Sequence, residues 1–164
     1  MILGMSTSAF TLLHVILSLA GIGAGLVAIL SLAGNKLSPG WTGFFLLTTA
    51  LTSITGFLFP FHGVTPGIVL GVLSMIVLLL ATAALYGGKL SGGWRGTFVV
   101  SAILALYFNV FVLFAQLFAK VPALKAIAPT PSSPAFGITQ LVVLAAFIVI
   151  AVKSFRGFRG PSPA

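Results

Sequence analysis

Residues 66–86 read PGIVLGVLSMIVLLLATAALY, an apolar run without one charged side chain. At 1.5 Å per residue, a helix of this length measures about 30 Å, which is the thickness of the hydrocarbon core of a bilayer. Pro66 suits the first turn of such a helix, because the N–H that proline lacks has no partner there. This stretch therefore predicts a membrane-spanning helix, with which the other apolar stretches of the chain can be compared.

Four further stretches have the same apolar character, and they cover residues 9–33, 41–61, 94–119 and 134–152. Each is long enough to cross the hydrocarbon core. We therefore expect an all-α integral membrane protein, a bundle of five transmembrane helices in a single domain over residues 1–164. Residues 153–164 are expected to form a basic cytoplasmic tail.

Composition narrows the chemistry that the chain can perform. The 164 residues include no Asp, Glu or Cys, and charged residues make up 5%, against about a quarter in soluble domains. Without Asp, Glu and Cys, the chain has no side chain for aspartyl or thiol catalysis. It also has no carboxylate side chain to couple transport to an ion. With only two histidines, no zinc site of three protein ligands can form. We expect neither an enzyme nor an obligatory cofactor or metal, and no GxSxG nucleophile motif is present.

The eight basic residues are distributed unequally between the two expected sides of the membrane. One side receives six of them, and these are Lys36, Lys89, Arg95, Lys153, Arg156 and Arg159. The other side receives Lys120 and Lys125. The positive-inside rule then places the N-terminus outside and the C-terminus in the cytoplasm. Lys153, Arg156 and Arg159 are expected to meet anionic lipid headgroups, and no nucleic-acid partner is expected.

An internal repeat links the first and second halves. Residues 34–45 align with residues 87–98 at an offset of 53, and eight of the twelve positions are identical. This predicts a duplicated helical hairpin, formed by the first and second spans and by the third and fourth, with a fifth helix appended. Two similar cytoplasmic turns without duplication are the alternative.

Small residues on the first and third spans predict close helix packing. Gly21 and Gly25 are four residues apart, a spacing that lets helices approach closely in lipid. Ser18 lies on the same helical face. The offset of 53 places Gly71 and Ser74 at the equivalent positions of the third span. We expect these five residues to lie at helix contacts.

Polar side chains within the apolar spans form a candidate ligand-binding site. They are His14, His62, Asn109, Gln116 and Gln140. Polar groups in hydrocarbon are costly unless they are paired, so such a cluster indicates either a site or hydrogen bonding between helices. His14 and His62 could ligate haem b, or one of them could bind a quinone carbonyl. The loop at 120–129 is expected to lie on the membrane surface, as a connector or as a lid over this cluster.

Residues 57–63, FLFPFHG, and residues 121–125, VPALK, resemble small uncharacterised bacterial polytopic inner-membrane proteins. The resemblance implies a bacterial inner (cytoplasmic) membrane, and it carries no activity and no site residues.

Our leading functional hypothesis is a non-catalytic membrane protein. It is either an accessory or anchoring subunit or a small bundle that binds an apolar ligand. The expected partners are anionic lipids, other membrane subunits or a second copy of the chain. Two alternatives stay open: a redox component binding haem b or quinone through His14 and His62, and a passive channel or carrier for a neutral or anionic solute.

Overall fold

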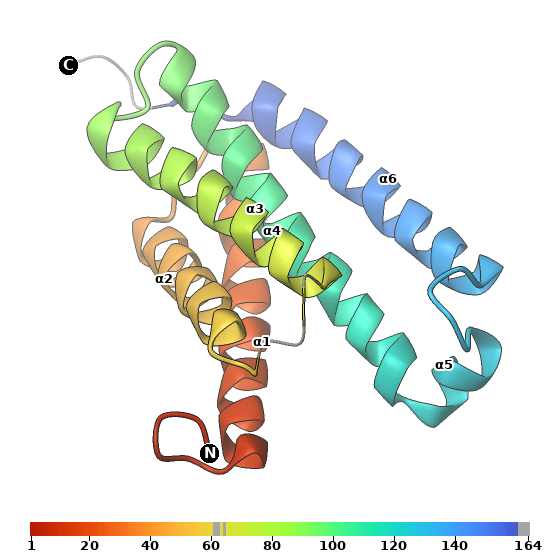
Figure 1. Ribbon diagram of the computed structural model, residues 1–164. Coiled ribbons are helices and arrows are strands. Elements are labelled where there is room, and N and C mark those ends of the chain that lie inside the picture. Colours follow the sequence, from red (N-terminus) through yellow and green to blue (C-terminus); the bar gives the residue numbers. More distant parts are fainter. Residues whose placement is uncertain (61–62, 64, 161–164) are drawn as a thin grey trace.

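The computed structural model describes residues 1–60, 63 and 65–160, and helices account for the long elements in this part (Figure 1). In chain order they are α1 (Thr7–Ala33), α2 (Pro39–Phe57), α3 (Pro66–Thr82), the π-helical turn η1 (Ala83–Gly87), α4 (Gly93–Lys120), α5 (Pro122–Ile127) and α6 (Pro134–Gly157). Helix α4 lies at the centre of the bundle, where it contacts α1, α2, α3 and α6.

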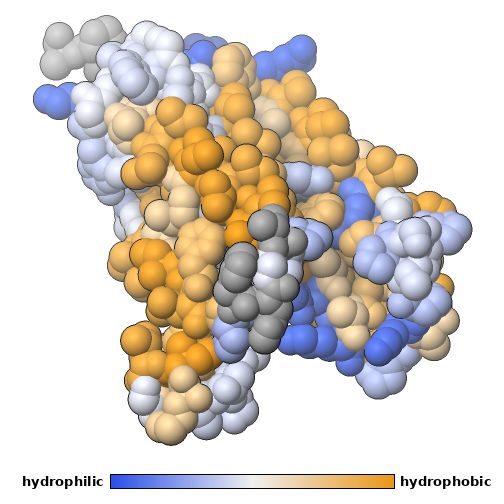
Figure 2. Space-filling view, viewed as in Figure 1, coloured by the Kyte–Doolittle hydropathy of each residue, from blue (hydrophilic) through white to orange (hydrophobic). Residues whose placement is uncertain are grey.

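Four helical segments of the described part are long and apolar enough to cross a membrane, and they are Thr7–Ala33, Pro66–Gly87, Gly93–Lys120 and Pro134–Gly157. This confirms an all-helical protein compatible with several membrane crossings. Figure 2 shows apolar side chains across the middle of the visible face and more polar ones toward its ends. Helix α2, which is rich in threonine and glycine, is not among these four segments of the described part, so its crossing stays a prediction.

Local sequence signals explain where the helices begin. The Ser6 hydroxyl accepts a hydrogen bond from the Ala9 N–H at 3.2 Å, and the Thr65 hydroxyl accepts one from the Ile68 N–H at 3.3 Å. Each satisfies one of the N–H groups that the first turn of a helix leaves unpaired. Proline occupies the first turn of α2, α3 and α6.

Glycines bring α1 close to its neighbours at the middle of the bundle. A Cβ atom on Gly25 would lie 2.7 Å from Leu106 Cδ1 and 2.8 Å from Phe45 Cδ2. A Cβ atom on Gly21 would lie 3.1 Å from the Thr48 hydroxyl oxygen. Both glycines are buried, so the face that the sequence predicts as a packing face meets α2 and α4.

The C-terminal end of α6 packs against the start of α4 and the end of α1. The Arg95 guanidinium donates to the carbonyl oxygens of Phe155, at 3.1 Å, and Phe158. The Ser154 hydroxyl donates to Ile29 O at 3.2 Å, and the Arg159 N–H donates to Asn35 Oδ1 at 2.8 Å. The sequence placed residues 153–157 in a tail, but α6 continues to Gly157, because these contacts give its last turn partners.

The two turns of the sequence repeat differ in backbone conformation. In the first turn Asn35 has a positive φ of 57°, whereas in the second Lys89 and Leu90 have φ values of 46° and 58°. The π-helical turn η1 precedes the second turn, and α1 continues as a regular α-helix up to the first. The identical residues therefore occupy turns of different geometry, and the duplicated hairpin stays a prediction.

Gly25→Ala should destabilise the fold, because the added methyl group would collide with the Phe45 ring and with Leu106. Overpacking of this kind costs about 1–3 kcal/mol. Gly23→Ala is the matched control, since no atom lies within 4 Å of its added Cβ. Thermal unfolding in mild detergent measures both variants. Equal melting temperatures for the two would contradict the packing described for Gly25.

Candidate functional site

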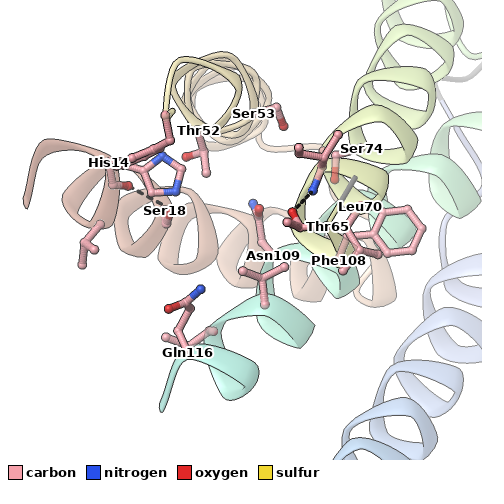
Figure 3. A pocket seen from close by; sticks show the side chains of 18 of the residues that line it. His14, Ser18, Thr52, Ser53, Thr65, Leu70, Ser74, Phe108, Asn109 and Gln116 are labelled. Atoms are coloured by element: carbon pink, nitrogen blue, oxygen red, sulfur yellow. Dashed lines mark hydrogen bonds between the residues drawn. The ribbon is translucent and has the colours of Figure 1, made fainter. Parts of the chain in front are cut away.

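A cavity of about 860 Å³ lies between α1, α2, α3 and α4, and we call it the α1–α4 cavity (Figure 3). Its walls come from the N-terminal half of α1, the end of α2, the start of α3 and the C-terminal half of α4. Most of the lining is apolar, with a few polar groups among aliphatic and aromatic side chains. This composition is typical of sites for small apolar or amphipathic ligands.

Small side chains explain why the helices leave this space unfilled. Ser18, Ser53, Gly56, Gly67 and Ser74 all face it, and none of them can reach across. At Gly71 the Phe57 ring fills the missing side-chain volume, and a Cβ there would lie 2.9 Å from the ring. Toward the other end of the bundle, larger side chains close the interior. The small residues of this chain therefore allow close packing at one level and leave a cavity at another.

His14 stands at the edge of the cavity, on α1, and is partly buried. Its Nδ1 lies 2.8 Å from the Thr55 hydroxyl oxygen of α2, and its ring meets the Phe59 ring edge-on at 5.4 Å between centroids. The chain contains no carboxylate that could neutralise an imidazolium here, so the neutral ring is the form that suits this position. Its contacts fix the position of the ring on the cavity wall.

Asn109 and Gln116 face the same cavity from α4. The Asn109 amide donates to the Thr49 hydroxyl at 3.2 Å, which ties α4 to α2. Bonds of this kind between membrane helices are worth about 0.6 kcal/mol on average. Gln116 has no hydrogen-bond partner among the described residues. Three of the five residues predicted to bind a ligand, His14, Asn109 and Gln116, thus line one cavity.

The other two predicted residues do not join them. His62 lies outside the described residues. Gln140 lies at the contact between α4 and α6, where it is 8% exposed and its amide donates to Phe111 O at 3.2 Å. Its Oε1 is buried without a hydrogen-bond partner in the described part of the chain. Gln140 is therefore not a cavity residue, because the turn of α6 on which it lies faces α4 and not α1.

Two cavity residues that the sequence alone did not single out as ligand groups are Ser53 and Ser74. Both residues are more than nine-tenths buried, and both line the cavity. Ser18 and Thr52 on the same walls donate to carbonyls of their own helices, at 2.9 and 2.8 Å. Ser74 was predicted as a packing residue from its size. A helical serine gives no sequence signal that tells these two roles apart.

The segment after α4 does not cover the cavity. Helix α5 contacts α4, and Figure 1 shows it beside the start of α6, away from α1 and α2. The lining extends only to Lys120 and Val121, at the end of α4, and includes no residue of α5. Of the two roles that the sequence left open for residues 120–129, connector and lid, the described arrangement favours the connector.

The residues expected to meet lipid headgroups lie at the opposite end of the bundle. Lys153, Arg156 and Arg159 are exposed there, beside the two turns of the repeat. They take no part in the α1–α4 cavity.

No protein-family model matches this chain, and no curated protein or solved structure matches it either.

Thr55→Val should change which nitrogen of His14 carries the proton. If the Thr55 hydroxyl donates to Leu51 O, which lies 2.8 Å away, then His14 Nδ1 donates to Thr55 Oγ1. Valine removes that acceptor, and the Nε2–H tautomer becomes accessible. ¹⁵N chemical shifts of labelled histidine, recorded in a His62→Gln background, report the tautomer. Identical shifts in both proteins would contradict this assignment.

Proposed function

We propose that this protein is a non-catalytic, multi-pass membrane protein that binds a small apolar or amphipathic molecule in the α1–α4 cavity. The observation that carries the proposal is the cavity itself, which combines a volume of about 860 Å³ with mostly apolar walls and a few convergent polar groups. Sites for small ligands commonly have this size and composition. The absence of Asp, Glu and Cys from the sequence supports binding in preference to catalysis.

The position of the cavity supports a binding site more than a channel. Its lining on α1 reaches from Thr11 to Ile22 and on α4 from Phe108 to Lys120. Beyond that level Ala24, Phe45 and Leu106 are almost wholly buried and fill the interior. Within the described residues the space therefore occupies one half of the bundle and does not continue through it.

The redox alternative now depends on His14. A bis-histidine haem would also need His62, which lies outside the described residues, and the cavity wall supplies no further histidine. A quinone needs no second histidine, because amide and hydroxyl groups such as those of Gln116 and Ser74 can bind its oxygens. Within this proposal, quinone is one member of the class of amphipathic ligands.

The membrane arrangement that we propose has five crossings, with α2 as the second. At 19 residues α2 is about 28 Å long, enough for the hydrocarbon core. Its threonine hydroxyls suit a membrane interior where they bond within the helix, as that of the buried Thr48 does to Phe44 O at 2.7 Å. We further propose that the N-terminus is outside, that the C-terminus is cytoplasmic and that the membrane is the bacterial inner membrane.

Val112→Trp should weaken binding by filling the cavity. Val112 lines the cavity from α4, and the indole would occupy space that a ligand needs. We expect at least a tenfold loss of affinity, equal to about 1.4 kcal/mol. Displacement of an environment-sensitive apolar fluorophore from the protein in nanodiscs measures it.

Val100→Trp provides the matched control on the same helix. Val100 is 47% exposed and does not line the cavity, so this variant should bind the fluorophore as the unaltered protein does. If Val112→Trp bound the fluorophore as tightly as Val100→Trp, the fluorophore would not occupy the cavity, and the proposed site would be wrong.

Single cysteines test the five-crossing arrangement, since the chain has no cysteine of its own. Lys36→Cys precedes α2 and Thr65→Cys follows it, and both positions are exposed. If α2 crosses the membrane, a membrane-impermeant maleimide added to spheroplasts labels Thr65→Cys and spares Lys36→Cys until the membrane is permeabilised. Labelling of both from one side would show that α2 does not cross.

A further inference from the structure

We propose that the α1–α4 cavity selects an amphiphile that bears a hydroxyl group, such as a long-chain alcohol or a quinol. It should prefer such a ligand over one whose polar end only accepts hydrogen bonds or is anionic. This inference rests on the proposed ligand-binding function and names the class of ligand. It follows from the hydrogen bonds of His14.

The first step is the proton of Thr55. A threonine hydroxyl has one proton, and two carbonyl acceptors of its own helix lie near Thr55 Oγ1, Leu51 O at 2.8 Å and Thr52 O at 3.1 Å. The same oxygen lies 2.8 Å from His14 Nδ1. We place the Thr55 proton on the side of the helix carbonyls, so that the oxygen accepts from the ring and His14 Nδ1 carries the ring proton.

The second step is the state of the other nitrogen. In a neutral imidazole with its proton on Nδ1, Nε2 holds a lone pair and can only accept. Figure 3 shows one ring nitrogen of His14 turned toward the space in front of Asn109 and Gln116. Among the described residues no donor reaches Nε2. The group that binds it from the cavity must therefore donate a hydrogen bond.

The third step concerns charge and matching donors. An anionic headgroup has no proton to donate, so it cannot hydrogen-bond to Nε2 of the neutral ring. Lys120, the one cation among the described lining residues, is exposed at the end of α4, where solvent screens its attraction. A ligand hydroxyl suits the site better, because its oxygen also accepts. The amide of Gln116, on the facing wall, offers N–H donors for it.

The test compares two matched pairs of ligands in nanodiscs, with occupancy measured by native mass spectrometry and fluorophore displacement. Hexadecanol is paired with hexadecyl methyl ether, and a decyl quinol is paired with its quinone, while hexadecanoate represents the anionic class. We expect each hydroxyl form to bind about tenfold more tightly than its acceptor-only partner, as one additional hydrogen bond allows. Whether hexadecanol or the quinol binds more tightly identifies the source of the hydroxyl.

Two variants connect the preference to His14. Thr55→Val should retain binding but reduce the preference to about twofold or less, because the Nε2–H tautomer can then donate to an ether or a carbonyl. Thr97→Val, another helical threonine whose hydroxyl bonds to its own helix, at 3.2 Å from Gly93 O, lies outside the cavity and should keep the full preference.

The outcomes separate this inference from the function on which it rests. Equal affinity for the alcohol and the ether, tightest binding of hexadecanoate, or an unchanged preference in Thr55→Val would overturn the selectivity and leave the binding function intact. Failure of all five probes to bind, or binding that Val112→Trp does not weaken, would overturn the proposed function itself.

Discussion

Because no side chain of this sequence is a carboxylate, cations and buried polar groups that bond to other side chains or to the backbone of the protein bond to neutral groups. Arg95 illustrates the solution, since its guanidinium bonds to two backbone carbonyls and lies 5.1 Å from the centre of the Phe155 ring. The same type of partner recurs within the bundle, where Ser154 donates to Ile29 O and Asn109 to the Thr49 hydroxyl. Carbonyl and hydroxyl acceptors thus replace the ion pairs that a soluble protein would use.

This constraint also determines the chemistry of the cavity. A carboxylate beside His14 could hold an imidazolium, whereas the Thr55 hydroxyl holds a neutral ring. The direction of one threonine proton then decides which nitrogen accepts. Threonines bonded to their own helix are common in membrane helices, and in the proposed site such a threonine would determine what a ligand must offer.

Much of the fold could be predicted from the sequence, because an apolar stretch of about 20 residues is expected to form a membrane-spanning helix. The expected limits 66–86 and 94–119 agree closely with the segment Pro66–Gly87 and with α4. The end of α6 was placed too early, since Lys153 and Arg156 suggested a tail and the contacts of Ser154 and Phe158 are not visible in a linear pattern. Helix α2 was harder to interpret, because its threonines lower its hydropathy while bonding within the helix.

The candidate site was only partly predictable. Helical spacing brought His14 to the interior face of α1, and the cavity unites it with Asn109 and Gln116. Gln140 was grouped with them because it lies at a similar depth, but depth does not define the direction in which a helix faces. Thr55 was visible as one of several threonines on α2. Its importance depends on the distance of 2.8 Å between Thr55 Oγ1 and His14 Nδ1. These two residues are 41 positions apart in the sequence, so a linear pattern does not reveal the contact.

The attachment of α6 has a consequence for how the protein is assembled. Its final turn contacts the end of α1 and the start of α4, through Ser154, Gly157 and the carbonyls that Arg95 binds. A ribosome completes α1 and α4 well before this turn exists. Until the last turn of α6 is made, the Arg95 guanidinium therefore lacks the carbonyl oxygens of Phe155 and Phe158, and this end of the bundle lacks the contacts that close it.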